Sequence, residues 1–113
     1  DGETYEALDD APYGKLPLVV LVDGGSASAA EILTVALKRN HRALIVGSRT
    51  FGKGTVQVMR EVGEGALKIT IGQYLGPGRV SIQGVGIMPQ IEVVPLDVSK
   101  KSVHLLNPDD QPK

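Results

Sequence analysis

The apolar positions in the first part of the chain predict a strand, a helix and a second strand. Residues 16–22 form a short run of branched apolar residues without charge, which is typical of a strand buried on both faces. Apolar residues recur at helical spacing from about residue 28 to residue 39, and another apolar run covers residues 43–46. We expect a βαβ unit whose strands pair in parallel with a right-handed crossover.

Alternating apolar and polar residues follow, and they predict a β-hairpin. Its first strand is expected at residues 55–61, its turn at residues 63–65 and its returning strand at residues 66–74. Residues 75–78 contain Gly-Pro-Gly. We predict no regular element there, because glycine and proline interrupt helices and strands.

Short apolar runs and two polar ends complete the chain. Residues 85–88 and 91–94 flank a proline, and we expect edge strands or extended segments there rather than a helix. Residues 1–15 hold five acidic residues and a single lysine, and residues 98–113 are again mostly polar. The chain therefore divides into an acidic lead-in, one α/β domain over residues 16–97 and a polar C-terminal tail.

Composition excludes several classes of function. Hydrophobic residues make up 42% and charged residues 22% of the 113 positions, as in an ordinary globular domain. A net charge of -1 argues against electrostatic binding to nucleic acid or a membrane. Without cysteine there is no disulfide, thiol nucleophile or thiolate metal site. His41 and His104 are far apart and support neither a histidine metal site nor a Ser-His-Asp triad.

The junction between the first strand and the helix places Ser26 and Ser28 near a helix N-terminus. The unpaired N–H groups of the first turn and the helix dipole favour negative charge there, which suits a nucleophile whose attack creates an oxyanion. A purely structural interpretation is also open. Ser28 followed three residues later by Glu31 fits a capping box, and serine is a preferred N-cap residue.

A second stretch favours the chemical interpretation. Lys53 lies between Gly52 and Gly54, where the missing side chains let the backbone pack closely and the lysine point inward. A serine at a helix N-terminus and such a lysine are the parts of a Ser/Lys dyad, in which a neutral amine takes the hydroxyl proton. The reference pKa of lysine, near about 10.4, must fall for this role, and burial is the usual cause. Gln57, in the following strand, could accept a hydrogen bond from the amine.

The same lysine allows a rival interpretation. Residues 47–53 have the spacing of a phosphate-binding loop, in which a glycine is followed by four residues, a second glycine and a lysine. That loop needs Ser or Thr directly after the lysine to bind Mg²⁺, and then a helix. Gly54 occupies this position and a strand pattern follows, so nucleotide binding is disfavoured.

Three motifs occur in a specific order. They are Leu-Pro-Leu-Val-Val-Leu-Val-Asp-Gly-Gly-Ser-Ala-Ser-Ala-Ala-Glu-Ile at residues 16–32, Phe-Gly-Lys-Gly-Thr-Val-Gln at residues 51–57, and Gly-Arg-Val-Ser-Ile-Gln-Gly-Val-Gly-Ile-Met-Pro at residues 78–89. Together they resemble the carboxy-terminal processing (tail-specific) proteases of serine peptidase family S41. The sequence departs from the family pattern at Ala30, where a serine is usual, and at Gln90, where an aspartate is usual.

The resemblance assigns roles to four residues. It implies that Ser28 is the nucleophile, Lys53 the general base, Gln57 the residue that orients the lysine, and the Ala29 N–H a donor of the oxyanion hole. It also implies an α/β fold of the crotonase/ClpP-like protease type, here a βαβ unit followed by a β-hairpin and short strands. Residues 16–97 would then be part of the catalytic domain. The expected substrates are C-terminal segments of proteins or peptides, with no metal or organic cofactor.

Family members carry further parts upstream of the first motif. These are an Asp-Leu-Arg-x-Asn-x-Gly-Gly segment, whose glycine supplies a second oxyanion donor, and a PDZ domain that binds the substrate's C-terminus. Neither is found in these residues, so we expect a truncated catalytic domain that does not cleave peptides alone. The resemblance implies a periplasmic, membrane-associated or otherwise extracytoplasmic location. As an alternative, exposed strand edges would make the chain a non-catalytic peptide-binding or assembly module, including a homodimer.

Overall fold

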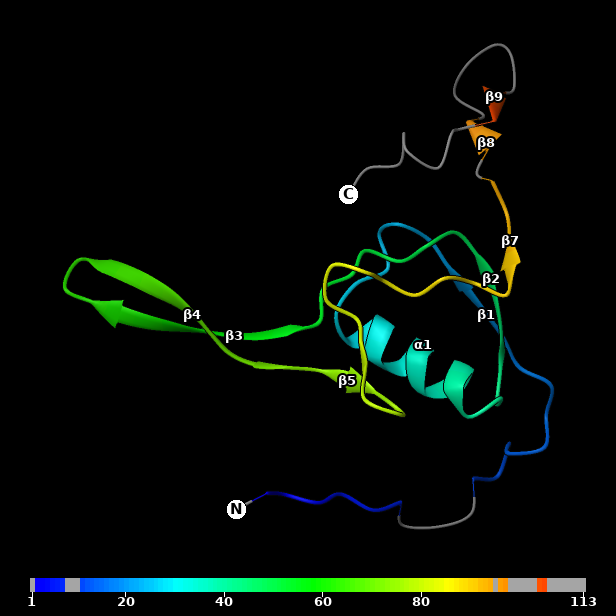
Figure 1. Cartoon of the computed structure of the whole chain (residues 1–113), viewed down its shortest axis with the longest axis horizontal. Helices are drawn as coiled ribbons and strands as arrows, with labels where there is room; N and C mark the ends of the chain where they lie inside the picture. The colour runs from blue at the N-terminus through cyan, green and yellow to red at the C-terminus, as the bar shows by residue number, and fades with distance from the viewer. Residues whose placement is uncertain (1, 8–10, 95, 98–103, 106–113) are drawn as a thin grey trace.

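The structure, a computed structural model, describes residues 2–7, 11–94, 96–97 and 104–105. These residues form one α-helix, one parallel three-stranded sheet and three antiparallel strand pairs (Figure 1). The helix lies beside the sheet, and one long hairpin projects away from both. No helix in the described part of the chain is long and apolar enough to cross a membrane.

The sheet confirms the predicted parallel βαβ unit. Its strands are β1 (Val19–Val22), β2 (Leu44–Gly47) and β7 (Ile91–Glu92), in the order β1-β2-β7. All three run parallel, and Val22 at the end of β1 pairs with Gly47 at the end of β2. The expectation of an edge strand within residues 91–94 is thus confirmed.

The prediction of a first strand over residues 16–22 and buried on both faces is wrong. The strand that forms, β1, is shorter than predicted and begins at Val19. Burial alternates along it: Val22 is buried against Ala43 and Ile45, whereas Val19 is 55% and Leu21 is 77% exposed. Alternate residues of a strand point to opposite faces. One face of β1 contributes to the core, and in the described part of the chain nothing covers the other.

Helix α1 (Ala29–Arg39) packs between two small apolar clusters. One is the cluster at the sheet, which Leu37 joins from the helix. The other lies under residues 82–87, where Val35 packs with Ile82 and Ile87. The helix therefore ties the sheet to the segment that carries the third sequence motif.

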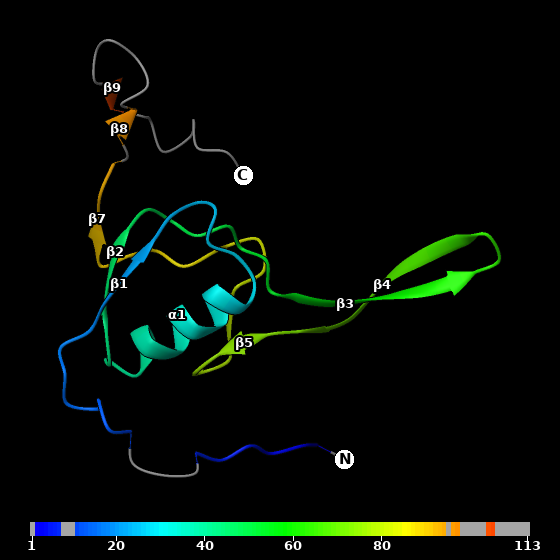
Figure 2. The same cartoon turned by 180° about the vertical axis from the view of Figure 1, so that it is seen from behind.

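The hairpin forms as predicted, with strands β3 (Thr55–Val62) and β4 (Gly65–Gln73). They pair antiparallel, with an irregularity in register between Val56 and Gln57. Both views of the chain show the hairpin projecting away from α1 and the sheet (Figures 1 and 2). Every residue of β4 is exposed, so neither face of this strand is covered by the described residues.

The prediction that residues 75–78 hold no regular element is wrong in part. Strand β5 (Leu75–Gly76) pairs antiparallel with β6 (Val80–Ser81). Proline is compatible with this pair because Pro77 lies in the connecting turn rather than in a strand. Gly76 is needed for close packing, since a Cβ there would lie 2.6 Å from a methyl group of Val35.

The C-terminal end is described at only four residues. Strand β8 (Leu96–Asp97) pairs with β9 (His104–Leu105), so part of the predicted polar tail forms a short antiparallel ladder. The rest of the tail prediction, at residues 98–103 and 106–113, lies outside the described residues.

The C-terminus of α1 ends in a Schellman motif. Arg42 N–H donates to the Leu37 carbonyl, and His41 N–H donates to the Lys38 carbonyl. His41 occupies the left-handed position of this motif with φ 53°. Glycine usually fills that position, because a Cβ is unfavourable there.

We therefore predict that His41→Gly stabilises the chain by roughly 0.5–1 kcal/mol, because it removes the Cβ penalty of the left-handed conformation. Urea unfolding followed by circular dichroism measures the change. His41→Ala is the matched control: it removes the imidazole but keeps the Cβ, so it should bring no such gain. Equal stability of the glycine and alanine variants would contradict the prediction.

Candidate active site at the carboxyl ends of β1 and β2

Two loops leave the same edge of the sheet. Strands β1 and β2 are parallel neighbours, so the loop before α1 and the loop before β3 both begin at carboxyl ends. In α/β folds, ligand sites form at this edge. Gly47 brings the loops close, since a Cβ at that position would lie 1.8 Å from the Val22 carbonyl oxygen.

The loop after β1 is organised by Asp23. Its Oδ1 accepts hydrogen bonds from Gly25 N–H at 2.9 Å, from Ser26 N–H at 3.0 Å and from Ser26 Oγ at 3.2 Å. The Ser26 carbonyl in turn accepts the Phe51 N–H at 2.9 Å. The hydroxyl of Ser26 is thus used to shape the loop, and the same residue links the two loops.

Ser28 has a strained backbone at the start of α1. It is the N-cap residue, with φ 56° and ψ -117°. A non-glycine residue in such a conformation costs of order 1–3 kcal/mol and persists only where its surroundings impose it. A serine on a sharp turn from strand to helix is also the arrangement that exposes the nucleophile in α/β-hydrolases.

Glu31 supplies the surroundings that impose this turn. The side chain is fully buried, and it accepts the Ser28 N–H as in the predicted capping box, whereas the Ser28 side chain makes no cap hydrogen bond. One oxygen, Oε2, accepts Ser28 N–H at 3.0 Å and Lys53 N–H at 2.8 Å. The other, Oε1, accepts Gly52 N–H at 2.7 Å and the Thr50 hydroxyl. A single carboxylate therefore satisfies four donors from two loops.

This arrangement brings Ser28 and Lys53 together. Their backbone nitrogens both donate to one oxygen, so they lie within about 6 Å of each other, the span of two hydrogen bonds of ordinary length. Sequence reasoning recognised Glu31 only as a capping residue. Its bonds to the second loop span 19 to 22 positions of sequence, and no local pattern signals them.

The side chains of the predicted site are less constrained than its backbone. Lys53 and Gln57 are exposed, so the expected burial of the lysine is not found in this chain. Gln57 Nε2 donates to Thr70 Oγ1 at 3.3 Å across the hairpin. In the described part of the chain, the Lys53 amine has no hydrogen-bond or ion-pair partner, and the Ala29 N–H has no acceptor.

The phosphate-binding alternative lacks its helix. Lys53 is followed by Gly54 and then by β3, as the sequence predicts. The described residues also contain no group of three or more His, Cys, Asp or Glu side chains that could hold a metal ion. The loop presents its N–H groups to the Glu31 carboxylate, and two of them are thereby occupied.

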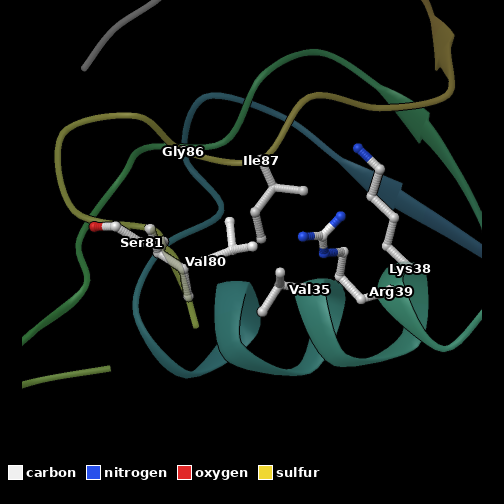
Figure 3. Close-up of a pocket in the computed structure, with 8 residues that line it drawn as sticks. Val35, Lys38, Arg39, Val80, Ser81, Gly86 and Ile87 are labelled. Atoms are coloured by element: carbon white, nitrogen blue, oxygen red, sulfur yellow. The ribbon is translucent and has the colours of Figure 1, made fainter. Parts of the chain in front are cut away.

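A hollow lies elsewhere, beside the C-terminal half of α1. In Figure 3, Val35 from the helix and Ile87 from the opposite segment point toward each other, with Lys38 and Arg39 at the rim. Lys38 Nζ donates to the Met88 carbonyl, and Arg39 Nε donates to the Pro77 carbonyl at 3.3 Å. The first bond holds the helix against the third motif, and the second holds it against the turn just before that motif. Ser28 and Lys53 do not line the hollow.

Comparison with known proteins identifies the family. The fold is α/β, with a serine and a lysine at the carboxyl edge of a parallel sheet. The model of peptidase family S41 matches residues 2–93, and the chain belongs to this family of serine-type peptidases.

Several relatives are carboxy-terminal processing proteases. The one from Bartonella bacilliformis is 49% identical over 89 residues, which are 74% of this chain and 20% of that protein. The one from Synechocystis sp. is 51% identical over 93 residues, which are 81% of this chain and 21% of that protein. A solved structure of a photosystem II D1 C-terminal processing protease matches with a TM-score of 0.65 and 42% identity, over 70% of this chain and 21% of that one. The chain thus spans about one fifth of the length of these relatives.

We predict that Glu31→Gln destabilises the chain by roughly 2–4 kcal/mol, because the new amide group faces backbone donors that need an acceptor. Denaturant unfolding measures the loss. Glu61→Gln makes the same chemical change on an exposed strand position and should stay within about 0.5 kcal/mol of the unsubstituted chain. The prediction is wrong if the two variants are equally stable.

Proposed function

We propose that this chain carries the catalytic dyad of a serine endopeptidase of the carboxy-terminal processing type. Ser28 Oγ attacks the scissile carbonyl while Lys53 Nζ accepts its proton and later returns it to the leaving amine. Water then hydrolyses the acyl-enzyme ester. The Ala29 N–H stabilises the oxyanion, and Gln57 orients the lysine once its side chain turns from Thr70 toward the amine.

The observation that carries this proposal is the convergence of Ser28 N–H and Lys53 N–H on Glu31 Oε2. It fixes the two residues side by side even though 24 positions lie between them in the sequence. Two further observations support it: the strained backbone of Ser28, and the Ala29 N–H at the first turn of α1, which has no acceptor among the described residues. An exposed amine is a poor base in water, so we propose that a molecule bound at Ser28, whether substrate or reagent, desolvates Lys53.

The same proposal covers the domain, the substrates and the location of the protein. We propose that residues 16–97 are part of a crotonase/ClpP-like catalytic domain and that the substrates are C-terminal segments of proteins. Relatives include proteases described as chloroplastic, and we propose an extracytoplasmic location for this one. Because the chain spans about a fifth of its relatives, we propose that it does not cleave peptides by itself.

A stoichiometric serine reagent tests the dyad without requiring peptide binding. We predict that a fluorophosphonate labels the chain slowly but measurably at Ser28, as located by mass spectrometry. Ser28→Ala should abolish labelling and Lys53→Met should slow it at least about 100-fold, since the general base is lost. Ser26→Ala is the matched control and should keep labelling within about threefold, because its hydroxyl only shapes the loop.

Three results would count against the assignment. Equal labelling of Lys53→Met and the unsubstituted chain would remove the lysine as base. Loss of labelling in Ser26→Ala but not in Ser28→Ala would mean that the other serine is the nucleophile. No labelling of the unsubstituted chain would remove the dyad from this chain.

A second candidate is a non-catalytic module that binds a peptide or a second copy through strand edges. It is favoured by the hairpin, whose outer edges are unpaired in the described part of the chain and whose apolar residues Met59, Leu67 and Ile71 are exposed. Sedimentation at increasing concentration detects such association. Under this candidate, association survives Ser28→Ala and Lys53→Ala; a monomer at every concentration would exclude self-association.

A further inference from the structure

The third sequence motif, residues 78–89, has no part in the dyad, yet it contacts the loop that carries Lys53. We propose that Gln83 is a positioning residue that sets the direction in which Lys53 leaves this loop. The proposal rests on the dyad proposed above, because the direction of Lys53 matters only if its amine serves Ser28.

Gln83 binds the peptide that follows Lys53. Its Oε1 accepts the Gly54 N–H at 2.8 Å, across 29 positions of sequence. The neighbouring Gly84 N–H donates to the Gly52 carbonyl at 2.8 Å. The two glycines that flank Lys53 are therefore both tied to the third motif, one by a side chain and one by the backbone.

The two segments are also packed too closely for larger residues. A Cβ at Gly54 would lie 2.7 Å from the Gln83 nitrogen, and one at Gly86 would lie 2.3 Å from the Thr50 carbonyl oxygen. Ile82, only 1% exposed, anchors the segment in the cluster under α1. Gln83 thus extends from a fixed support.

Together with Glu31, this contact fixes three successive N–H groups. Glu31 binds those of Gly52 and Lys53, and Gln83 binds that of Gly54. Glu31 holds the N–H of Lys53, but this residue can still turn about its bond from N to Cα, and that turn swings the bond from Cα to Cβ together with the following peptide. Because Gln83 holds the Gly54 N–H, it prevents this turn. The lysine side chain therefore leaves the backbone in one fixed direction relative to Ser28.

The test uses this chain and the fluorophosphonate reaction at Ser28, resolved into the maximal labelling rate and the reagent concentration at half-maximal rate. Gln83→Leu removes the acceptor, and Gln83→Asn keeps an amide that is one methylene too short to reach Gly54. We expect both to lower the maximal rate about tenfold and to leave the half-maximal concentration unchanged, because the base is misdirected and reagent binding is not. A purely structural role would not separate these two quantities.

Gln73→Leu is the matched control, because it deletes a glutamine side chain whose hydrogen bond goes to Ser81 Oγ, at 2.7 Å, instead of the lysine loop. It should label at the rate of the unsubstituted chain. A normal maximal rate in both Gln83 variants, with Lys53→Met still slow, would overturn the role of Gln83 and leave the dyad intact. If Lys53→Met itself labels normally, the dyad is wrong and the inference is overturned with it.

Discussion

The buried carboxylate of Glu31 is the interaction on which the arrangement of this edge of the sheet depends. A carboxylate away from water is unfavourable unless its oxygens are hydrogen-bonded, and here four donors satisfy them. Those donors belong to the turn before α1 and to the loop before β3, which share no strand pairing. The cost of burying one charge is therefore offset by bonds that hold two loops together.

The position of Glu31 at the first turn of a helix further stabilises its buried carboxylate. The helix dipole favours a negative group there, both for Glu31 in the resting chain and for an oxyanion during a reaction, and the Ala29 N–H has no acceptor in the described part of the chain. Ser28 keeps its strained backbone because its N–H is one of the four donors. The same helix N-terminus thus serves the structure and the proposed chemistry. Loss of the carboxylate would free the Ser28 N–H and leave three donors of the lysine loop without their acceptor.

Local periodicity was enough to predict most elements of the fold. The parallel strands, the helix and the hairpin follow from patterns within single segments, and the structure contains all of them. The burial of β1 was mispredicted because an uninterrupted apolar run does not tell whether a second layer covers the sheet, and Leu21 is left exposed. Strand β5 was missed because Gly76 was taken as a residue that interrupts a strand, whereas it lies within β5 and lets the backbone pack closely on Val35.

The residue types of the candidate site were predictable from the sequence, but the hydrogen bonds that hold its loops in place were not. The glycines on both sides of Lys53 indicated that another segment packs closely against this loop, and in the structure that segment is the third motif. The contacts of Glu31 and Gln83 with this loop span 19 to 29 positions, and a capping box or a lone glutamine gives no sign of them. Only the fold brings these segments together.

Amide hydrogen exchange measured by NMR tests the central claim, that one carboxylate holds both loops. If Glu31 acts as described, the amides of Ser28, Gly52 and Lys53 are all protected and exchange through one common opening, with the same free energy. Exchange of the Lys53 amide at the rate of an unprotected peptide, while that of Ser28 stays protected, would contradict the account, because the two loops would then be held independently.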